Sequence, residues 1–314
     1  SLTLMPFWGK MHAVSWRRRT ALRAFLTYAV YRFLGAVTGP LPPPAGYWLA
    51  RRAGALLYRF SPRLRGVFSH NIRHVLGPGA DEERLEAMVR EAFVHVAKGH
   101  YDLFRVSRLS IDQIKDRVHI EGMSHLTKAL SRGQGAVVVT AHVGNVDIVG
   151  QVPLAYGIPI TGAAMHAQPE RLFQYTLKLR QSHGLRLLPS DGPMIGLIRA
   201  LKRGELIALP CDRLTGDSAR PVEFFGAPAR LPDGPVRIAL RTGAPLMPAF
   251  VLRLPDDSFV IQVGPPLELR RTGDTEADVA VGMEGVVRAM ERHIAQHPEQ
   301  WLVAAPVWPM DNEA

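Results

Sequence analysis

Seven short apolar runs alternate with segments of helical pattern over the last two thirds of the chain, and this alternation constrains the fold most. The runs are rich in aliphatic and β-branched residues, which is typical of buried strands. Strands and helices that alternate in this way form a sheet with right-handed crossovers. The sequence therefore predicts an α/β fold, a mixed sheet flanked by helices, with strands at Val118–Glu121, Ala136–Thr140, Ile160–Ala164, Arg186–Leu188, Leu206–Pro210, Leu246–Leu252 and Phe259–Val263.

The connections and the N-terminal third favour helices. Asp256-Asp257, between the last two strands, predicts an antiparallel hairpin at one edge of the sheet. Residues 1–117 are expected to form a helical N-terminal region and residues 118–314 an α/β core that is one structural unit. The expected helices are Gly46–Phe60, Pro62–Leu76, Asp81–Arg105, Met123–Arg132, Val146–Tyr156, Pro169–His183, Pro193–Arg203, Pro235–Thr242 and Glu276–Gln296.

The N-terminus carries a basic cluster, Trp16–Arg19, followed by the apolar run Ala21–Val37. Arg23 and Arg32 interrupt this run, and prolines from Pro40 onward disrupt the next one. A transmembrane span or a signal peptide is therefore not expected. An amphipathic helix lying in a membrane interface fits better, with a helix packed on the protein's own core as the alternative.

The charge balance indicates a polyanionic partner. The 314 residues include 38 Lys and Arg against 28 Asp and Glu, a net charge of +10. An anionic membrane surface or a phosphorylated substrate fits this charge, whereas no module typical of nucleic-acid binding is present. A single cysteine excludes an internal disulfide, and no metal-ligand spacing is found.

The stretch that most clearly carries chemistry is Gly135–Gly150, a buried strand followed by a turn and a helix. His142 lies on the turn and Asp147 in the first helical turn. Five helical steps would set these side chains about 140° apart, so they meet only if the turn folds His142 back. Asp147 could then fix the imidazole tautomer and leave the other nitrogen as a base. Otherwise Asp147 caps a helix and His142 is a surface residue.

Three further places could contribute to a site. Arg180 lies near the end of a basic helix, and Asp212 follows the strand Leu206–Pro210, at the sheet edge where α/β folds bind ligands. Cys211 is expected to be a small buried residue and not a nucleophile. The segment Pro221–Phe250 is expected to be a long loop at its start, where Phe224-Phe225 either forms an apolar wall for a chain-like ligand or packs under the loop.

Taken together, these motifs resemble the bacterial lipid A biosynthesis acyltransferase family, which includes late lauroyl and myristoyl transferases and phosphatidylinositol mannoside acyltransferases. The resemblance covers nearly the whole chain. Its ordered elements are His142-x4-Asp147, Arg180-x3-Gly184, Asp212, Phe224-Phe225-Gly226-x-Pro228, Pro232-x-Gly234-Pro235, Thr242-Gly243-Ala244-Pro245 and His297-Pro298-Glu299-Gln300-Trp301.

The resemblance implies a glycerolipid-acyltransferase-like fold and a peripheral or monotopic enzyme on the cytoplasmic face of the bacterial plasma membrane. It implies transfer of an acyl chain from acyl-CoA or acyl carrier protein, as co-substrate, to a glycolipid hydroxyl, with no cofactor. His142 would be the base and Asp147 its partner, while Asn145, Arg180 and Asp212 would bind substrate. The ending Ala304–Pro309 is closer to the mannoside branch, but Met165 stands where that branch has an acidic residue.

The identity of the acceptor, the acyl chain length, the type of thioester donor and the oligomeric state stay open at this level. The main alternative is a membrane lipid-binding protein with a degenerate, non-catalytic site. A serine hydrolase would require a G-x-S-x-G elbow, which the sequence lacks.

Overall fold

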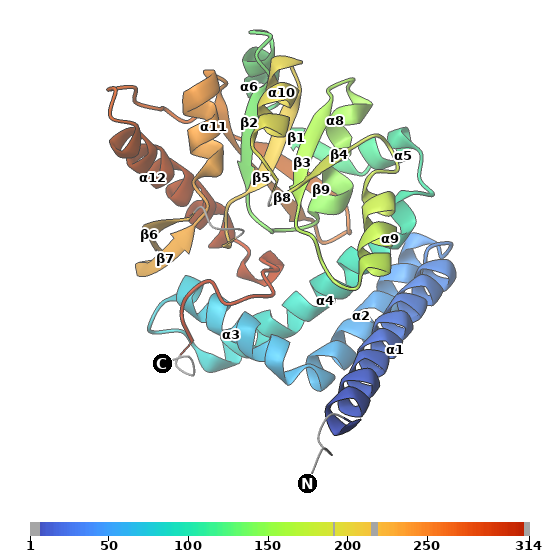
Figure 1. Cartoon of the computed structure of the whole chain (residues 1–314). Coiled ribbons are helices and arrows are strands. Elements are labelled where there is room, and N and C mark those ends of the chain that lie inside the picture. Colours follow the sequence, from blue (N-terminus) through green and yellow to red (C-terminus); the bar gives the residue numbers. More distant parts are fainter. Residues whose placement is uncertain (1–6, 191, 215–218, 311–314) are drawn as a thin grey trace.

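A mixed seven-stranded sheet forms the centre of the computed structural model, which describes residues 7–190, 192–214 and 219–310 (Figure 1). Its strands are β1 (Val118–Glu121), β2 (Ala136–Thr140), β3 (Ile160–Ala164), β4 (Arg186–Pro189), β5 (Leu206–Pro210), β8 (Leu246–Arg253) and β9 (Phe259–Val263). Their order is β1-β9-β8-β2-β5-β3-β4. The predicted α/β fold with a mixed sheet flanked by helices is confirmed, and each predicted strand matches within one residue.

The hairpin predicted around Asp256-Asp257 exists, but it does not form the edge of the sheet. β8 and β9 pair antiparallel, as expected. β1 then adds in parallel outside β9, with Val118 opposite Phe259. The sequence gives no sign of this pairing, because β1 is short and lies far from β9 along the chain.

Side-chain alternation along the strands divides the core into two layers. On β2, Val137 and Val139 join the cluster under α10 (Ile195–Lys202), α11 (Gly234–Thr242) and α12 (Thr275–Ile294). Ala136 and Val138 face the opposite layer. That layer includes α5 (Ile111–Lys115), α6 (Met123–Leu130), α7 (Val146–Val149), α8 (Val152–Ala155) and α9 (Glu170–Arg180). The predicted helix Val146–Tyr156 is thus two short helices.

A second sheet, β6 (Arg220–Phe224) and β7 (Ala227–Leu231), lies where the sequence predicts a loop. Phe225 and Gly226 form its turn with φ of 49° and 71°, as a two-residue hairpin turn requires. The loop prediction is wrong there because Phe-Gly lacks the usual Asn-Gly signature of such turns. Phe224 is fully buried against Trp301 and Trp308, so it belongs to the core.

Four helices pack beneath the sheet: α1 (Phe7–Thr38), α2 (Pro43–Phe60), α3 (Pro62–Leu76) and α4 (Glu82–Val106) (Figure 1). α4 is the central one and contacts the other three. The second half of α1 is packed on the protein. The Tyr31 ring lies 4.9 Å from the Phe104 ring, and a Cβ on Gly35 would come within 2.6 Å of the Tyr175 hydroxyl. Among the described helices, none is both long and apolar enough to cross a bilayer.

Asp102 on α4 joins the helical layer to the sheet through a buried polar network. This carboxylate is 1% exposed. It accepts hydrogen bonds from Tyr47 Oη at 2.7 Å and Asn145 Nδ2 at 2.9 Å, and it forms an ion pair with Arg253 of β8. Lys98 pairs with Asp257 at 2.6 Å in the same region. Each buried charge is therefore matched, which offsets the desolvation that burial imposes.

We expect Asp102→Ala to lower the free energy of unfolding by about 3–5 kcal/mol, because it leaves the buried Arg253 guanidinium with only the longer contact to Asp257, at 3.4 Å, and removes the acceptor of Tyr47 and Asn145. Urea denaturation followed by circular dichroism measures the change. Glu86→Ala is the control, because it removes the exposed Glu86–Arg90 pair and should leave the midpoint nearly unchanged. Equal effects of the two substitutions would contradict a stabilising role for the Asp102 network.

Candidate active site

The loop that follows β2 carries His142 and is fixed on three sides. Gly144 has φ of 66°, and a Cβ there would lie 2.5 Å from the Val251 carbonyl oxygen, so only glycine fits. The Gly144 N–H donates to the Gln300 carbonyl at 3.0 Å, and the Leu302 N–H donates to the His142 carbonyl at 2.8 Å. The C-terminal segment around the short helix Pro298–Gln300 thus holds the loop in place.

Asn145 caps the helix after this loop and does not line a cavity. Its Oδ1 accepts from the backbone N–H groups of Asp147 and Ile148 at 3.0 and 3.3 Å, and its Nδ2 donates to Asp102. Asn145 is 5% exposed. The resemblance implies a substrate-binding role for it, but all of these contacts lie within the protein. Its geometry is that of a residue that positions the His142 loop.

The partner of His142 is Asp212. His142 Nδ1 lies 2.7 Å from Asp212 Oδ1, and the His142 backbone N–H donates to Oδ2 at 2.6 Å. A third donor, Trp301 Nε1, reaches Oδ2 at 2.8 Å. The sheet register explains the encounter: Thr140 of β2 lies opposite Pro210 of β5, so the residues two positions further on meet at the same edge.

The electrostatics of Asp212 favour the carboxylate. Burial alone would raise the pKa of the Asp212 carboxyl, but the His142 charge and the hydrogen bonds from His142 and Trp301 outweigh it. The net pKa lies below its ordinary value. Because a carboxylate only accepts hydrogen bonds, Nδ1 of the neutral imidazole carries the proton and Nε2 is left as the basic nitrogen.

Asp147 does not take the place beside His142 that the sequence predicts. Its carboxylate contacts Arg180 of α9, with Oδ1 2.8 Å from Nε and Oδ2 accepting from an Nη at 3.2 Å. The reason is local: Asp147 is the second residue of α7 and faces α9, while the turn carries His142 toward β5. Arg180, expected to bind substrate, is thus engaged by a carboxylate, although both residues line the same cavity as His142.

That cavity has a volume of about 420 Å³ and is mainly apolar. It lies on one face of the sheet, since its strand residues alternate with those that point into the opposite core. The size falls within the range of about 300–1,000 Å³ typical of ligand sites. Its polar side chains include His142, Asp147, Arg180 and Arg213, and the strand residues that line it include Val138, Thr140, Gly162, Ala208, Ala249, Val251 and Ile261.

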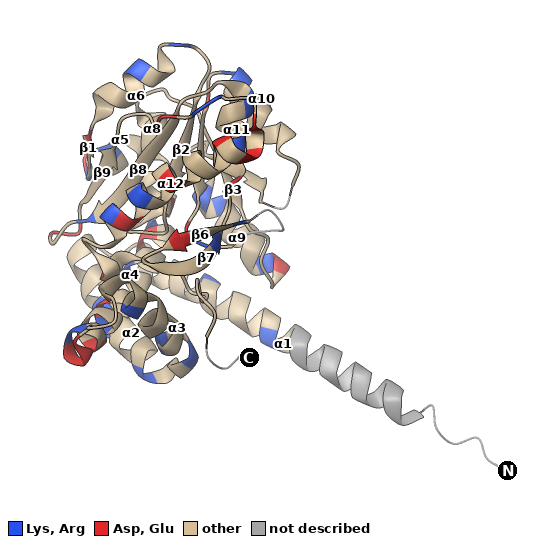
Figure 2. Cartoon of the chain, turned by 90° about the vertical axis from the view of Figure 1, so that its left-hand side faces the viewer, with Lys and Arg blue, Asp and Glu red and all other residues tan. Residues whose placement is uncertain are grey.

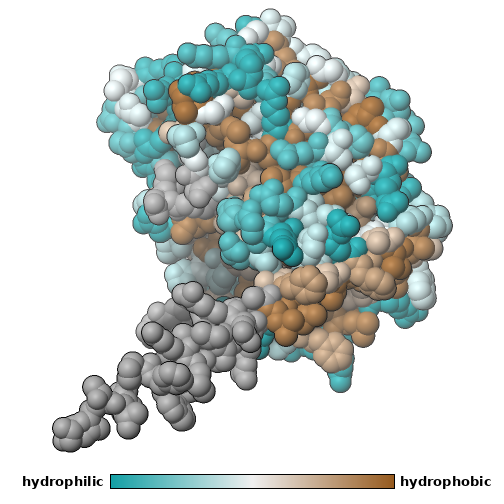
Figure 3. All heavy atoms as spheres, turned by 45° about the vertical axis from the view of Figure 1, so that its right-hand side comes forward, coloured by the Kyte–Doolittle hydropathy of each residue, from teal (hydrophilic) through white to brown (hydrophobic). Residues whose placement is uncertain are grey.

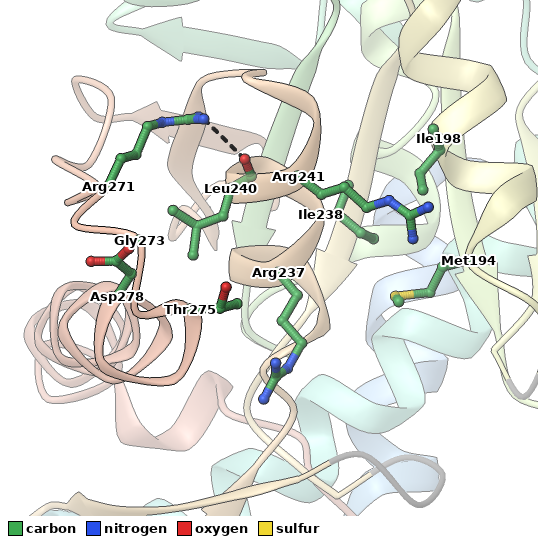
Figure 4. Close-up of a pocket in the computed structure, with 10 residues that line it drawn as sticks. All are labelled: Met194, Ile198, Arg237, Ile238, Leu240, Arg241, Arg271, Gly273, Thr275 and Asp278. Atoms are coloured by element: carbon green, nitrogen blue, oxygen red, sulfur yellow. Dashed lines mark hydrogen bonds between the residues drawn. The ribbon is translucent and has the colours of Figure 1, made fainter.

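A second cavity, of about 590 Å³, lies on the other face, between α10, α11 and the residues that lead into α12 (Figure 4). Its arginines are largely engaged by the protein. Arg237 pairs with Asp233 and Glu276, and Arg271 donates to the carbonyl oxygens of Leu240 and Ala239. This cavity lacks a histidine or a nucleophile beside it, so it offers no counterpart of the His142 site. Across the described ranges, no cluster of His, Cys, Asp and Glu is suited to hold a metal ion.

Cys211 is adjacent to Asp212 but is not built as a nucleophile. It is 1% exposed, and burial together with the Asp212 charge raises the pKa of its thiol above the ordinary value.

We expect iodoacetamide to leave Cys211 unmodified in the native protein and to alkylate it fully after denaturation, as measured by mass spectrometry. Rapid alkylation of the native protein would show that the thiol is accessible and ionised.

Comparison with known proteins gives a consistent result. The model of the family described as bacterial lipid A biosynthesis acyltransferase matches residues 14–309. The phosphatidylinositol mannoside acyltransferase of Mycobacterium tuberculosis strain H37Rv is 30% identical over 247 residues, which cover 77% of this chain and 76% of that protein. The protein of the same name from Mycolicibacterium smegmatis is 28% identical over 246 residues, covering 77% and 78% of the two chains.

Proposed function

Because the chain belongs to the bacterial lipid A biosynthesis acyltransferase family, we propose that it transfers a fatty acyl chain from an acyl thioester to a hydroxyl of a membrane glycolipid. It is an acyltransferase of lipid biosynthesis by family. The observation that carries the mechanism is the His142–Asp212 pair at the edge of an apolar cavity. Acyl-CoA and acyl carrier protein are the two candidate donors, and no cofactor is required.

His142 acts as the general base. Its Nε2 takes the proton of the acceptor hydroxyl while the oxygen attacks the thioester carbonyl carbon. The C–S bond then breaks, and the imidazolium returns the proton to the leaving thiolate. Asp212 keeps the imidazole in the productive tautomer and stabilises its charged form, in the manner of the acidic residue of a catalytic triad. The thioester is already activated, so no covalent enzyme intermediate is needed.

The apolar cavity suits the acyl chain of the donor. Its walls include residues of β2, β3, β5 and β8, most of which are small or aliphatic, and His142 lies in the same lining. A chain buried there would place its carbonyl carbon next to the base. Positioning of this kind contributes a large part of the rate when two reactants are held together.

The acceptor is proposed to be a phosphatidylinositol mannoside-like or lipid A-like glycolipid. The argument for the first is the name shared by the mycobacterial relatives, and the argument for the second is the family description. The enzyme would then work at the cytoplasmic face of the plasma membrane. Its net charge of +10 suits both an anionic membrane and phosphorylated substrates.

The surface of α1 and α2 supports attachment to that membrane. The described part of α1 exposes Leu22, Phe25, Leu26, Val30, Phe33, Leu34 and Val37, which recur at helical spacing. α2 exposes Trp48, Leu49, Leu56, Leu57 and Phe60. Figure 3 shows a hydrophobic band at the base of the molecule, beside the grey segment, and Figure 2 shows Lys and Arg residues on α2 and α3. Apolar side chains with nearby basic residues are typical of helices that lie in a membrane interface.

We expect His142→Ala to lower kcat by about 10²–10⁴-fold and Asp212→Asn by about 10²–10³-fold, the contribution typical of base catalysis. The loss in Asp212→Asn is expected because an amide can present its NH2 group to the imidazole, which no longer fixes the productive tautomer. The assay uses detergent-solubilised phosphatidylinositol mannoside and a labelled acyl-CoA, followed over pH.

Asp147→Asn is the matched control. It removes the negative charge opposite Arg180 but leaves the His142–Asp212 pair intact, so its kcat should fall much less than that of Asp212→Asn. If Asp147→Asn lowers kcat more than Asp212→Asn does, the base is oriented by Asp147 and the assignment above is wrong. If neither His142→Ala nor Asp212→Asn lowers turnover, the mechanism proposed here is wrong. If the wild type itself shows no acyl transfer, the non-catalytic lipid-binding alternative gains support.

We expect Phe33→Glu to weaken binding to phosphatidylglycerol liposomes about tenfold or more, because burying a Phe side chain contributes about 1.5–3 kcal/mol. Phe33 is 66% exposed, so the fold should persist. Ala277→Glu on α12 adds the same charge to a different exposed surface and should bind liposomes as the wild type does. Flotation assays measure both, and equal binding by the two variants would place the membrane contact elsewhere.

A further inference from the structure

Among the residues that the structure describes, one cation that lines the apolar cavity has no partner. His142 is matched by Asp212, and Arg180 by Asp147. Arg213 also lines the cavity, and its guanidinium has no ion pair or hydrogen bond with any of the described residues. Its Nε is buried from solvent and has no acceptor within residues 7–190, 192–214 and 219–310. A buried polar atom without a partner is rare, because leaving it unmatched costs free energy.

The position of Arg213 ties it to the reacting centre. It follows Asp212 directly, and successive Cα atoms lie about 3.8 Å apart. Asp212 in turn contacts the His142 ring at 2.7 Å. An anion held by Arg213 would therefore lie close to the hydroxyl from which His142 takes a proton.

We propose that Arg213 binds the phosphate of the acceptor lipid, an inference that rests on the function proposed above. The planar guanidinium is suited to phosphate oxygens, which it binds through two parallel N–H groups. In a glycosylated phospholipid the phosphate lies near the sugar that carries the acylated hydroxyl. The phosphates of a coenzyme A donor lie beyond a long pantetheine arm, and are therefore far from the thioester that reacts at His142.

The first experiment compares two acceptors that share a sugar and differ in charge. Phosphatidylinositol mannoside carries the phosphate, and mannosyl diacylglycerol does not. For Arg213→Ala we expect the KM for the phosphorylated acceptor to rise about 10- to 100-fold, the loss of one hydrogen bond to a charged group. The KM for acyl-CoA should stay unchanged, and the KM for the neutral acceptor should change little. The KM of Arg213→Lys for the phosphorylated acceptor should lie between those of the wild type and Arg213→Ala. Lysine keeps the positive charge but lacks the two parallel N–H groups of the guanidinium.

Arg241→Ala is the matched control, because this arginine lines the cavity on the opposite face of the sheet (Figure 4). It should behave as the wild type does with both acceptors. A rise in the KM for acyl-CoA alone would assign Arg213 to the donor phosphates and overturn the proposal. Equal loss of kcat with both acceptors would assign it to the transition state and overturn it as well.

A binding measurement separates this inference from the proposed reaction. Short-chain phosphatidylinositol dispersed in neutral detergent serves as the probe, and its affinity is measured by calorimetry without turnover. Wild type and Arg241→Ala should bind it, and Arg213→Ala should bind about 10- to 100-fold more weakly. Equal affinities would overturn the role of Arg213 even if acyl transfer is confirmed. Weaker binding by Arg213→Ala would support it even if transfer is not found.

Discussion

The carboxylate of Asp212 is the interaction on which the site depends. It is fully buried and accepts three hydrogen bonds, from the His142 ring, the His142 backbone and the Trp301 indole. A buried carboxylate is tolerated only when its oxygens are satisfied in this way. The same bonds join three distant parts of the chain, the ends of β2 and β5 and the C-terminal segment. One charged group thus fixes both the tautomer of the His142 imidazole and the position of its loop.

Asp102 holds the His142 loop from the other side. Its buried carboxylate accepts hydrogen bonds from Asn145 and Tyr47 and forms an ion pair with Arg253. This network couples the helices below the sheet to the strand ends. Asn145 caps α7 while it binds Asp102, so the helix that begins after His142 is anchored to α4. The helices that expose apolar residues to the surface and the loop that holds His142 are therefore parts of one packed unit. A lipid bound at α1 and α2 would therefore contact the same packed unit that positions the His142 loop.

The cavity itself follows from one face of the mixed sheet. Its strands present small and aliphatic residues on one face, and the short helices α7 and α8 leave space above them. The charges gather at the loops that follow β2 and β5, at the carboxyl ends of the strands, where open α/β sheets bind ligands. His142 and Arg180 each pair with a carboxylate of the protein, whereas Arg213 has no ion pair with any residue that the structure describes.

The sequence alone determined the strands, because short β-branched runs between glycines, prolines and charges admit few other structures. It also predicted His142, Asp147, Arg180 and Asp212 as candidate site residues, and the order of its motifs indicated the family. It did not determine which carboxylate pairs with His142. That choice depends on the register of β2 against β5 and on the direction that Asp147 takes on a four-residue helix, and neither is encoded locally. Tertiary structure also decided the β6–β7 hairpin, the pairing of β1 with β9 and the isolation of Arg213, because each depends on contacts between segments far apart in the chain.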